Sequence, residues 1–163
     1  MENQGATIHV LSVLVQDDSG VLGRITGLFS RRGYSIRSIS AAQTEDPQIS
    51  RMTIVAECTE DTLEQIDNQL SKLVHVKEVT VLDEKNSVRR EHVLVKAGSG
   101  EDTRRGLVDV ANLFQAKVVD VGADNLMLEL TGEPRTIDAF IRLVKPYGIQ
   151  KLVRTGITAL ARG

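Results

Sequence analysis

The residues best suited to chemistry in this chain form an acidic turn, Asp17-Asp-Ser-Gly20. The turn follows an apolar segment and opens a second segment whose apolar residues have the spacing of one helix face. A helix start leaves backbone N–H groups without intrahelical acceptors, and such groups attract a carboxylate. The carboxylate of Asp17 attracts an ammonium group. The turn therefore offers both halves of a site for a free amino acid.

Other patterns that could support catalysis or metal binding are weak. Asp17 and Asp18 are adjacent, so in an extended segment they point to opposite sides and make a poor acid–base pair. Cys58 has no histidine near it in the sequence, which favours a buried, unreactive thiol. No histidine has a Cys, Asp or Glu partner at metal-ligand spacing; the three are His9, His75 and His92. We therefore expect no catalytic residue and no metal site in the chain.

Composition argues against several classes of function. The formal net charge at pH 7 is −2, which gives no electrostatic basis for binding nucleic acid. Aromatic residues make up 3% of the chain and tryptophan is absent, so platforms for stacked bases are not expected. No apolar run approaches the ~18 residues of a membrane helix. Residues 1–7 lack the pattern of a signal peptide, and the single cysteine cannot form an internal disulfide, so we expect a cytoplasmic protein.

Hydrophobic spacing in the first half predicts four strands and two helices in the order β-α-β-β-α-β. The strands lie at residues 8–15, 34–42, 51–58 and 76–82, one helix runs from the acidic turn to Gly33, and the other starts near Thr59 or Asp61, where Asp61 and Glu64 resemble a capping box. Residues 43–50 form a polar loop that contains Pro47. Residues 83–91 are polar and highly charged, which favours a linker between two domains.

Beyond this linker the same order begins again. The expected strands are 92–97, 116–121, 126–131 and 149–153, with one helix after the turn at 98–102 and another from Pro134 to Gly148. The order fits the split β-α-β layout of ferredoxin-like folds. We therefore predict an α+β protein with two ferredoxin-like β-α-β-β-α-β domains, at residues 7–83 and 90–163. The second domain has no counterpart of the acidic turn.

Taken alone, the acidic turn is also compatible with an ordinary capped helix start, with Asp18 or Ser19 as the cap. The wider sequence favours a binding site. The run from Asp17 to Ile39 resembles the first part of an ACT domain, a regulatory module that commonly binds amino acids at a dimer interface. Three further segments are similar to the regulatory small subunit of acetohydroxyacid synthase, also called acetolactate synthase: 44–54, 63–74 and 154–163.

The resemblance implies a non-catalytic subunit whose first domain is an ACT domain. Such a subunit activates a separate catalytic subunit and confers feedback inhibition by valine in the biosynthesis of branched-chain amino acids, isoleucine included. The cofactors thiamine diphosphate, FAD and magnesium then belong to the catalytic subunit, and none to this chain. The chain is expected to form a homodimer. The loop at residues 43–50 and the second domain are the candidate contacts with the catalytic subunit.

The resemblance also assigns the effector site. In it, Asp17 faces the effector's ammonium group, the backbone at the helix start faces its carboxylate, and Ser35 and Ile36 come from the other protomer. Many family members have Asn in place of Asp17 and of Ser35. The carboxylate of Asp17 should hold an ammonium at least as well, whereas Ser35 is shorter and leaves a gap or recruits a water. The predicted set is Asp17, Ser19, Gly20, Val21, Leu22, Ser35 and Ile36.

Two other classes of function compete with this interpretation. The first is a stand-alone ACT-type amino-acid sensor that regulates another enzyme; a transcriptional sensor would need a basic DNA-binding element, and the sequence shows none. The second is a small enzyme with ferredoxin-like halves, which lacks any constellation of nucleophile, base or metal ligands. Activation of a catalytic subunit by the chain would distinguish the subunit from both.

Overall fold

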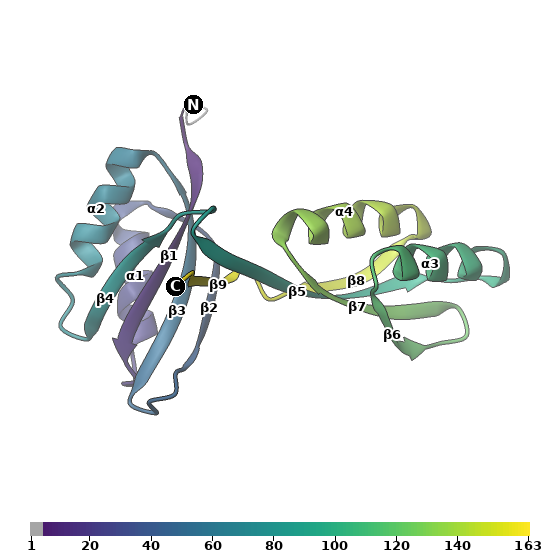
Figure 1. Ribbon diagram of the computed structural model, residues 1–163, viewed down its shortest axis with the longest axis horizontal. Helices are drawn as coiled ribbons and strands as arrows, with labels where there is room; N and C mark the ends of the chain where they lie inside the picture. Colours follow the sequence, from purple (N-terminus) through teal and green to yellow (C-terminus); the bar gives the residue numbers. More distant parts are fainter. Residues whose placement is uncertain (1–4) are drawn as a thin grey trace. The chain divides into compact units, whose positions relative to one another are not determined.

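A computed structural model of the chain describes residues 5–163; the first four residues, part of the segment in which the sequence shows no signal peptide, lie outside the described residues. The chain forms two compact units (Figure 1). The first consists of the chain up to Val88 together with Gly156–Gly163, and the second of Arg89–Thr155. The sequence-based boundaries, 7–83 and 90–163, differ from this division mainly in the last eight residues, which pack with the first unit.

The first unit is a four-stranded antiparallel sheet with two helices on one face (Figure 1). The strand order is β2-β3-β1-β4, so the apolar first strand lies in the interior of the sheet, as its two apolar faces predict. Strand β1 pairs with β3 on one side and β4 on the other. The elements are β1 (Thr7–Gln16), α1 (Val21–Arg32), β2 (Ser35–Gln43), β3 (Ile49–Cys58), α2 (Glu60–Leu70) and β4 (Val76–Leu82).

The ends of the two helices test the sequence-based boundaries. Gly33 has the left-handed φ of 68° and donates its N–H to the carbonyl of Ser30, so the predicted end of α1 is confirmed. Helix α2 begins after Thr59, whose hydroxyl accepts the N–H of Thr62. The alternative start with Asp61 in a capping box is therefore wrong, because Asp61 already lies in the first turn of the helix.

The face of the first sheet opposite the helices carries a second, smaller apolar cluster. Strand β9 (Thr158–Ala161) lies on it, and the buried side chain of Ala159 packs with Val10, Val55 and Leu82. Gly156 leads into this strand with φ of 76°, and a Cβ at this position would lie 2.5 Å from the Cβ of Ser38. The position therefore requires glycine. The sequence-based prediction did not include β9.

The second unit repeats the architecture of the first, as predicted from the sequence. Its sheet has the order β6-β7-β5-β8 and is antiparallel, with α3 and α4 on one face (Figure 1). Pro134 occupies the first turn of α4, as expected. Its elements are β5 (Ser87–Gly98), α3 (Glu101–Leu113), β6 (Lys117–Val121), β7 (Asn125–Gly132), α4 (Pro134–Val144), a short 3-10 helix (Lys145–Tyr147) and β8 (Ile149–Arg154).

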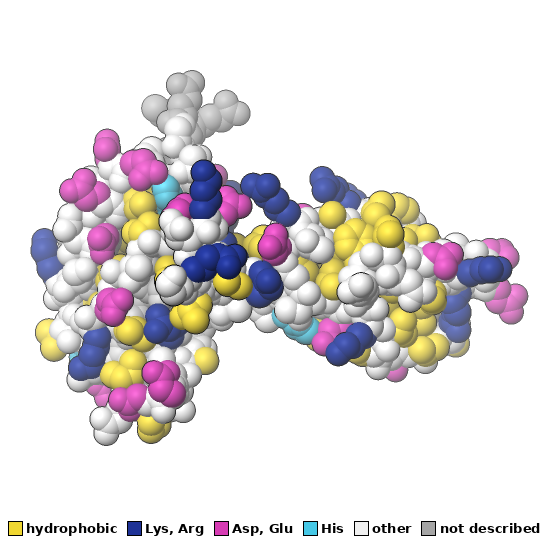
Figure 2. All heavy atoms as spheres, viewed as in Figure 1, with side chains coloured by type: hydrophobic (Ala, Val, Ile, Leu, Met, Phe, Trp, Pro, Cys, Tyr) yellow, Lys and Arg dark blue, Asp and Glu magenta, His cyan; other side chains and the backbone are white. Residues whose placement is uncertain are grey.

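Acidic and basic side chains are scattered over the face of the molecule seen in Figure 2. Within residues 5–163 no helix is long and apolar enough to cross a membrane. The same described range contains no group of three or more His, Cys, Asp or Glu side chains placed to hold a metal ion. Burial raises the pKa of the Cys58 thiol above its ordinary value, so the cysteine is a poor nucleophile.

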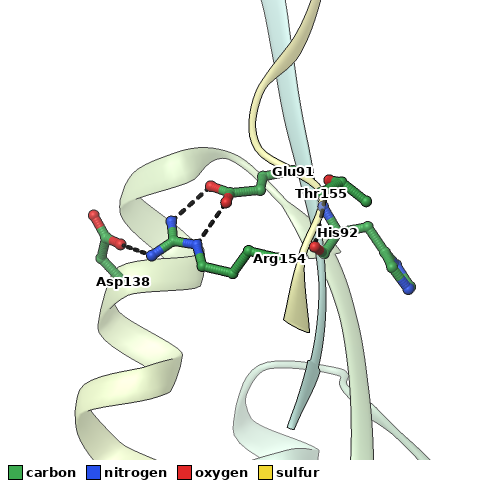
Figure 3. Close-up of polar contacts among 5 residues, drawn as sticks. All are labelled: Glu91, His92, Asp138, Arg154 and Thr155. Carbon is green, nitrogen blue, oxygen red and sulfur yellow. Dashed lines mark hydrogen bonds and ion pairs between the residues drawn. The ribbon is translucent and has the colours of Figure 1, made fainter. Parts of the chain in front are cut away.

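The predicted linker at residues 83–91 is partly wrong, because β5 already begins at Ser87. The last residue of the predicted linker, Glu91, also forms an ion pair with a distant part of the chain. Glu91 is 4% exposed and accepts two hydrogen bonds from Arg154, at 2.5 and 2.7 Å (Figure 3). Arg154 also donates to Asp138 of α4 at 2.9 Å. The carboxylate looks like a solvated linker charge in the sequence, but it is buried and paired in the fold.

Candidate functional site

The acidic turn opens onto a cavity of about 400 Å³ in the first unit. The cavity lies where β1 ends and α1 begins, and the β2–β3 hairpin forms its other side. Four of the predicted site residues line it, namely Asp17, Gly20, Val21 and Leu22, whereas Ser19 is exposed in the turn and does not. The complete lining is Val15, Gln16, Asp17, Asp18, Gly20, Val21, Leu22, Ala41, Ala42, Gln43, Ser50 and Met52.

The start of α1 presents free backbone donors at this cavity. Gly20 is the N-cap residue, with φ of 85°, and no side chain caps the helix. The alternative in which Asp18 or Ser19 caps the helix is therefore wrong. The N–H of Val21 donates to the carbonyl of Asp18 at 3.3 Å, but those of Leu22 and Gly23 have no acceptor within the described chain. These two groups, at the positive end of the helix dipole, suit a carboxylate.

Asp17 is held by the two strands of the hairpin. Its Oδ2 accepts a hydrogen bond from Nε2 of Gln43 at 2.6 Å, and its Oδ1 accepts one from the hydroxyl of Ser50 at 2.9 Å. These bonds, the one from Gln43 first, hold the pKa of Asp17 below its ordinary value against a small opposing effect of burial. The side chain is therefore an anion at neutral pH. A carboxylate has about four lone-pair sites, so two remain for a cation.

Gln43 and Ser50 are site residues that the sequence analysis missed as ligands of Asp17. Gln43 ends β2, Ser50 lies near the start of β3, and the two are direct partners across the hairpin. Ser50 also pairs with Val15, two residues before Asp17. The predicted loop at 43–50 contained the necessary signal, because residues that flank a hairpin loop face each other. Their contact with Asp17, however, depends on the pairing of β3 with β1.

Apolar side chains complete the cavity wall. Val15, Val21 and Met52 are almost fully buried and contribute a firm apolar surface. Leu22 is 47% exposed, so it offers apolar surface that is still free to be covered. A site of this kind, apolar with a few polar groups of defined direction, is typical of small-molecule pockets. Its polar groups match the two ends of an amino acid, and its apolar wall matches an aliphatic side chain.

Ser35 and Ile36 lie away from this cavity in the same chain. They begin β2, opposite Glu57 and Ala56 of β3, whereas the cavity is at the other end of β2. Ser35 and Gln43 are the first and last residues of this nine-residue strand, and the eight steps between them correspond to roughly 26 Å. One chain therefore does not bring Ser35 and Ile36 to its own Asp17. Their contribution from a second protomer remains a prediction.

His75 stabilises the turn from outside. Its Nδ1 lies 3.1 Å from Oε1 of Gln16 and 3.2 Å from Oδ2 of Asp18, and its carbonyl accepts the N–H of Gln16. The histidine thus fixes the residues on either side of Asp17. Within the described residues it belongs to no group of three or more possible metal ligands, and none of these contacts is a nucleophile, so we assign it a structural role.

A β-α-β-β-α-β unit with a small-molecule cavity at the turn between its first strand and helix is the arrangement of an ACT domain. The model of the "AHAS small subunit-like ACT domain" matches residues 11–78, and that of the "Small subunit of acetolactate synthase" matches residues 90–163. The chain belongs to the family of acetolactate synthase small subunits, a family of regulatory ACT-domain subunits. The resemblance stated from the sequence is confirmed.

Relatives support this assignment over the whole chain. The acetolactate synthase small subunit of Mycolicibacterium smegmatis is 44% identical over 161 residues, which cover 99% of this chain and 95% of that protein. The Bacillus subtilis small subunit is 43% identical over 156 residues, or 95% and 91% of the two chains. The crystal structure of the small subunit from Thermotoga maritima matches with a TM-score of 0.89 and 35% identity, covering 96% of this chain and 98% of that one.

Proposed function

We propose that this chain activates a separate catalytic subunit of acetolactate synthase and makes it sensitive to feedback by valine. The regulatory role follows from the family. The observation that supports an amino-acid effector is the anchored carboxylate of Asp17 in a cavity that Leu22 also lines, at the helix start where the N–H groups of Leu22 and Gly23 are free. One group accepts an ammonium and the other donates to a carboxylate, so together they select a free amino acid.

The apolar wall narrows the choice of effector. In this proposal the ammonium binds Asp17, the carboxylate binds the start of α1, and the side chain lies along Leu22 and Met52. Leu22 is the exposed part of this apolar wall, and an aliphatic side chain would cover it. Valine meets these demands and is an end product of the pathway. Ser35 and Ile36 of a second protomer would close the site in a homodimer.

The division of labour between the two subunits is part of the same proposal. We assign the reaction, with its thiamine diphosphate, FAD and magnesium, to the catalytic subunit and give this chain no catalytic step. The loop at residues 43–50, hereafter the hairpin loop, and the second unit are our candidate contacts with the catalytic subunit. We place the complex in the cytoplasm, in keeping with the single, buried thiol of Cys58.

Reconstitution with the catalytic subunit tests the proposal. Adding the chain should raise acetolactate production severalfold, and valine should lower it again. Deletion of Thr44–Gln48 should impair the activation while valine binding stays measurable by calorimetry. Valine binding without any activation would instead favour a stand-alone amino-acid sensor. Full activation by the deletion variant would exclude the hairpin loop as a contact.

A further inference from the structure

Asp17 makes three hydrogen bonds to the hairpin loop. Its backbone N–H donates to the carbonyl of Gln48 at 2.8 Å. Its carboxylate accepts from Gln43, before the loop tip, and from Ser50, after it. The residue that receives the ammonium in our proposal is thus tied to the beginning, the middle and the end of one loop.

The loop itself is internally bonded. The N–H of Thr44 donates to the carbonyl of Ile49 at 2.8 Å, and the N–H of Ile49 donates to the carbonyl of Asp46 at 3.0 Å. The carboxylate of Asp46 accepts the N–H of Gln48 at 2.9 Å. These bonds connect the two ends of the loop to its tip. A change at Gln43 therefore reaches its tip.

Gln43 restricts the conformation of the Asp17 side chain. Asp17 is exposed, so without partners its side chain would exchange between rotamers. The amide of Gln43 holds one oxygen and the hydroxyl of Ser50 holds the other, which fixes the direction of the remaining lone pairs. A receptor group that is already fixed loses less entropy when its ligand binds.

We propose that Gln43 is a positioning residue of the amino-acid site, through which the bound amino acid and the hairpin loop stabilise each other. The inference rests on the proposed function, since it takes Asp17 as the acceptor of the ammonium group. The coupling is reciprocal by thermodynamic linkage: an amino acid on Asp17 orders the loop, and a partner that fixes the loop tightens the binding of the amino acid. The effector is thereby connected to a candidate contact with the catalytic subunit.

Two alanine variants of the full chain test this inference. Gln43→Ala removes the bond from Nε2 to Oδ2 of Asp17 and the longer one, of 3.4 Å, from the same nitrogen to the carbonyl of Pro47. Gln48→Ala is the matched control, because the bond of Gln48 to Asp17 uses the backbone carbonyl and survives the substitution. In calorimetry with valine, the dissociation constant should rise about fivefold in Gln43→Ala, the usual effect of one hydrogen bond, and stay within twofold in Gln48→Ala.

Hydrogen exchange measures the coupling directly. In the wild type and in Gln48→Ala, the backbone amides of residues 44–49 should exchange several times more slowly at saturating valine than without valine. In Gln43→Ala the same saturation should leave their exchange nearly unchanged. Because each sample is saturated, this readout does not depend on the difference in affinity.

The acid limb of valine binding separates positioning from a merely structural role. Loss of the Gln43 bond raises the pKa of Asp17 toward its ordinary value, so binding should fail at a higher pH in Gln43→Ala than in the wild type. A simple loss of stability would leave this limb in place. The other titratable groups on the surrounding elements are the same in both proteins: Asp18, Glu45, Asp46 and His75.

The outcomes distinguish this inference from the proposed function. If the wild type binds no valine, the proposed function fails and the inference fails with it. If the wild type binds valine but Gln43→Ala shows the same affinity, the same protection of residues 44–49 and the same acid limb, only the inference is overturned. An equal loss in Gln48→Ala would also overturn it, since general loosening of the loop would then explain both variants.

Discussion

The two units share the backbone contacts at the end of their first strands and differ in the side chains of the turn beyond. In the first unit, the last residue of the strand, Gln16, donates its N–H to the carbonyl of His75 at 2.9 Å. In the second, Gly98 donates to the carbonyl of Gly148, also at 2.9 Å. Each bond ties the first strand to the connection after the second helix. The frame of the fold is therefore common to both units and cannot by itself explain a binding site.

The next residue makes an equivalent contact in both units. Asp17 donates its N–H to the carbonyl of Gln48, and Ser99 donates to that of Asp124, each at 2.8 Å. Both acceptors lie in the hairpin between the two middle strands. The side chains differ, however: Asp17 is exposed, whereas Ser99 is 1% exposed. The same position thus carries an accessible carboxylate in one unit and a buried hydroxyl in the other.

In the second unit, an arginine side chain fills the corresponding turn. Arg104 donates to the hydroxyl of Ser99 and to the carbonyls of Gly122 and Ala123, each at 2.8 Å. At the helix start, the N–H of Gly100 donates to the hydroxyl of Thr103, a side-chain contact that the start of α1 lacks. In the first unit the corresponding groups are an acceptor with spare lone pairs and a helix start with free donors. The turn of the second unit is thus bonded internally, whereas that of the first unit keeps an accessible carboxylate.

The largest effect on valine binding is expected from substitution of Asp17, the accessible carboxylate of the first unit. Asp17→Ala should weaken valine binding roughly 10- to 150-fold, because it removes the charged partner of the ammonium. Asp17→Asn keeps an oxygen acceptor without the charge, so its affinity for valine should lie between that of the wild type and that of Asp17→Ala. The matched change in the second unit, Ser99→Ala, should leave calorimetric affinity unaltered. Unchanged affinity in Asp17→Ala would show that the cavity is not the effector site.

A smaller effect is expected at the closed turn. Arg104→Ala leaves the buried hydroxyl of Ser99 and two carbonyls without their donor, so it should lower the free energy of unfolding by about 2 kcal/mol. The exposed neighbour serves as control, and Arg105→Ala should change stability by less than about 0.5 kcal/mol. Urea denaturation gives both values. A loss of valine affinity in Arg104→Ala would contradict the assignment of this turn to stability alone.

The smallest expected effect is on the stability of the fold at low pH. Asp17 has a pKa below its ordinary value in the folded chain, so its contribution to stability is present above the unfolded pKa and is lost as the pH falls through the folded one. Ser99 does not titrate, so the second unit lacks this contribution. Urea denaturation between about pH 5 and pH 2 should show a shallower loss in Asp17→Asn than in the wild type. Identical profiles would mean that Gln43 and Ser50 do not act on a charged Asp17.

Local signals predicted the parts of the molecule that local chemistry determines. The spacing of apolar residues identified α1, and Gly33 marked its end, because a left-handed residue there is a matter of a few neighbouring atoms. The acidic turn was likewise visible as a helix start. The hydrogen-bond partners of Asp17 were not visible in the sequence, because Gln43 and Ser50 reach Asp17 only after β3 has paired with β1.

The missed features share a long sequence separation. Glu91 was interpreted as a linker charge because its partner, Arg154, is 63 residues away. Strand β9 has only four residues, and nothing near it in the chain shows that its apolar side chains face Val10 and Leu82. In both cases the stabilising contact is tertiary, so propensity and periodicity have no access to it.

The return of the last segment to the first unit has a consequence for biosynthesis. Since Gly156–Gly163 packs with residues that precede Val88, the second unit is, in chain order, an insertion within the first. Its entry and exit are joined by reciprocal hydrogen bonds, from the N–H of His92 to Thr155 Oγ1 and from the N–H of Thr155 to the carbonyl of His92. The first unit therefore receives its last strand, β9, only after the whole second unit has been synthesised.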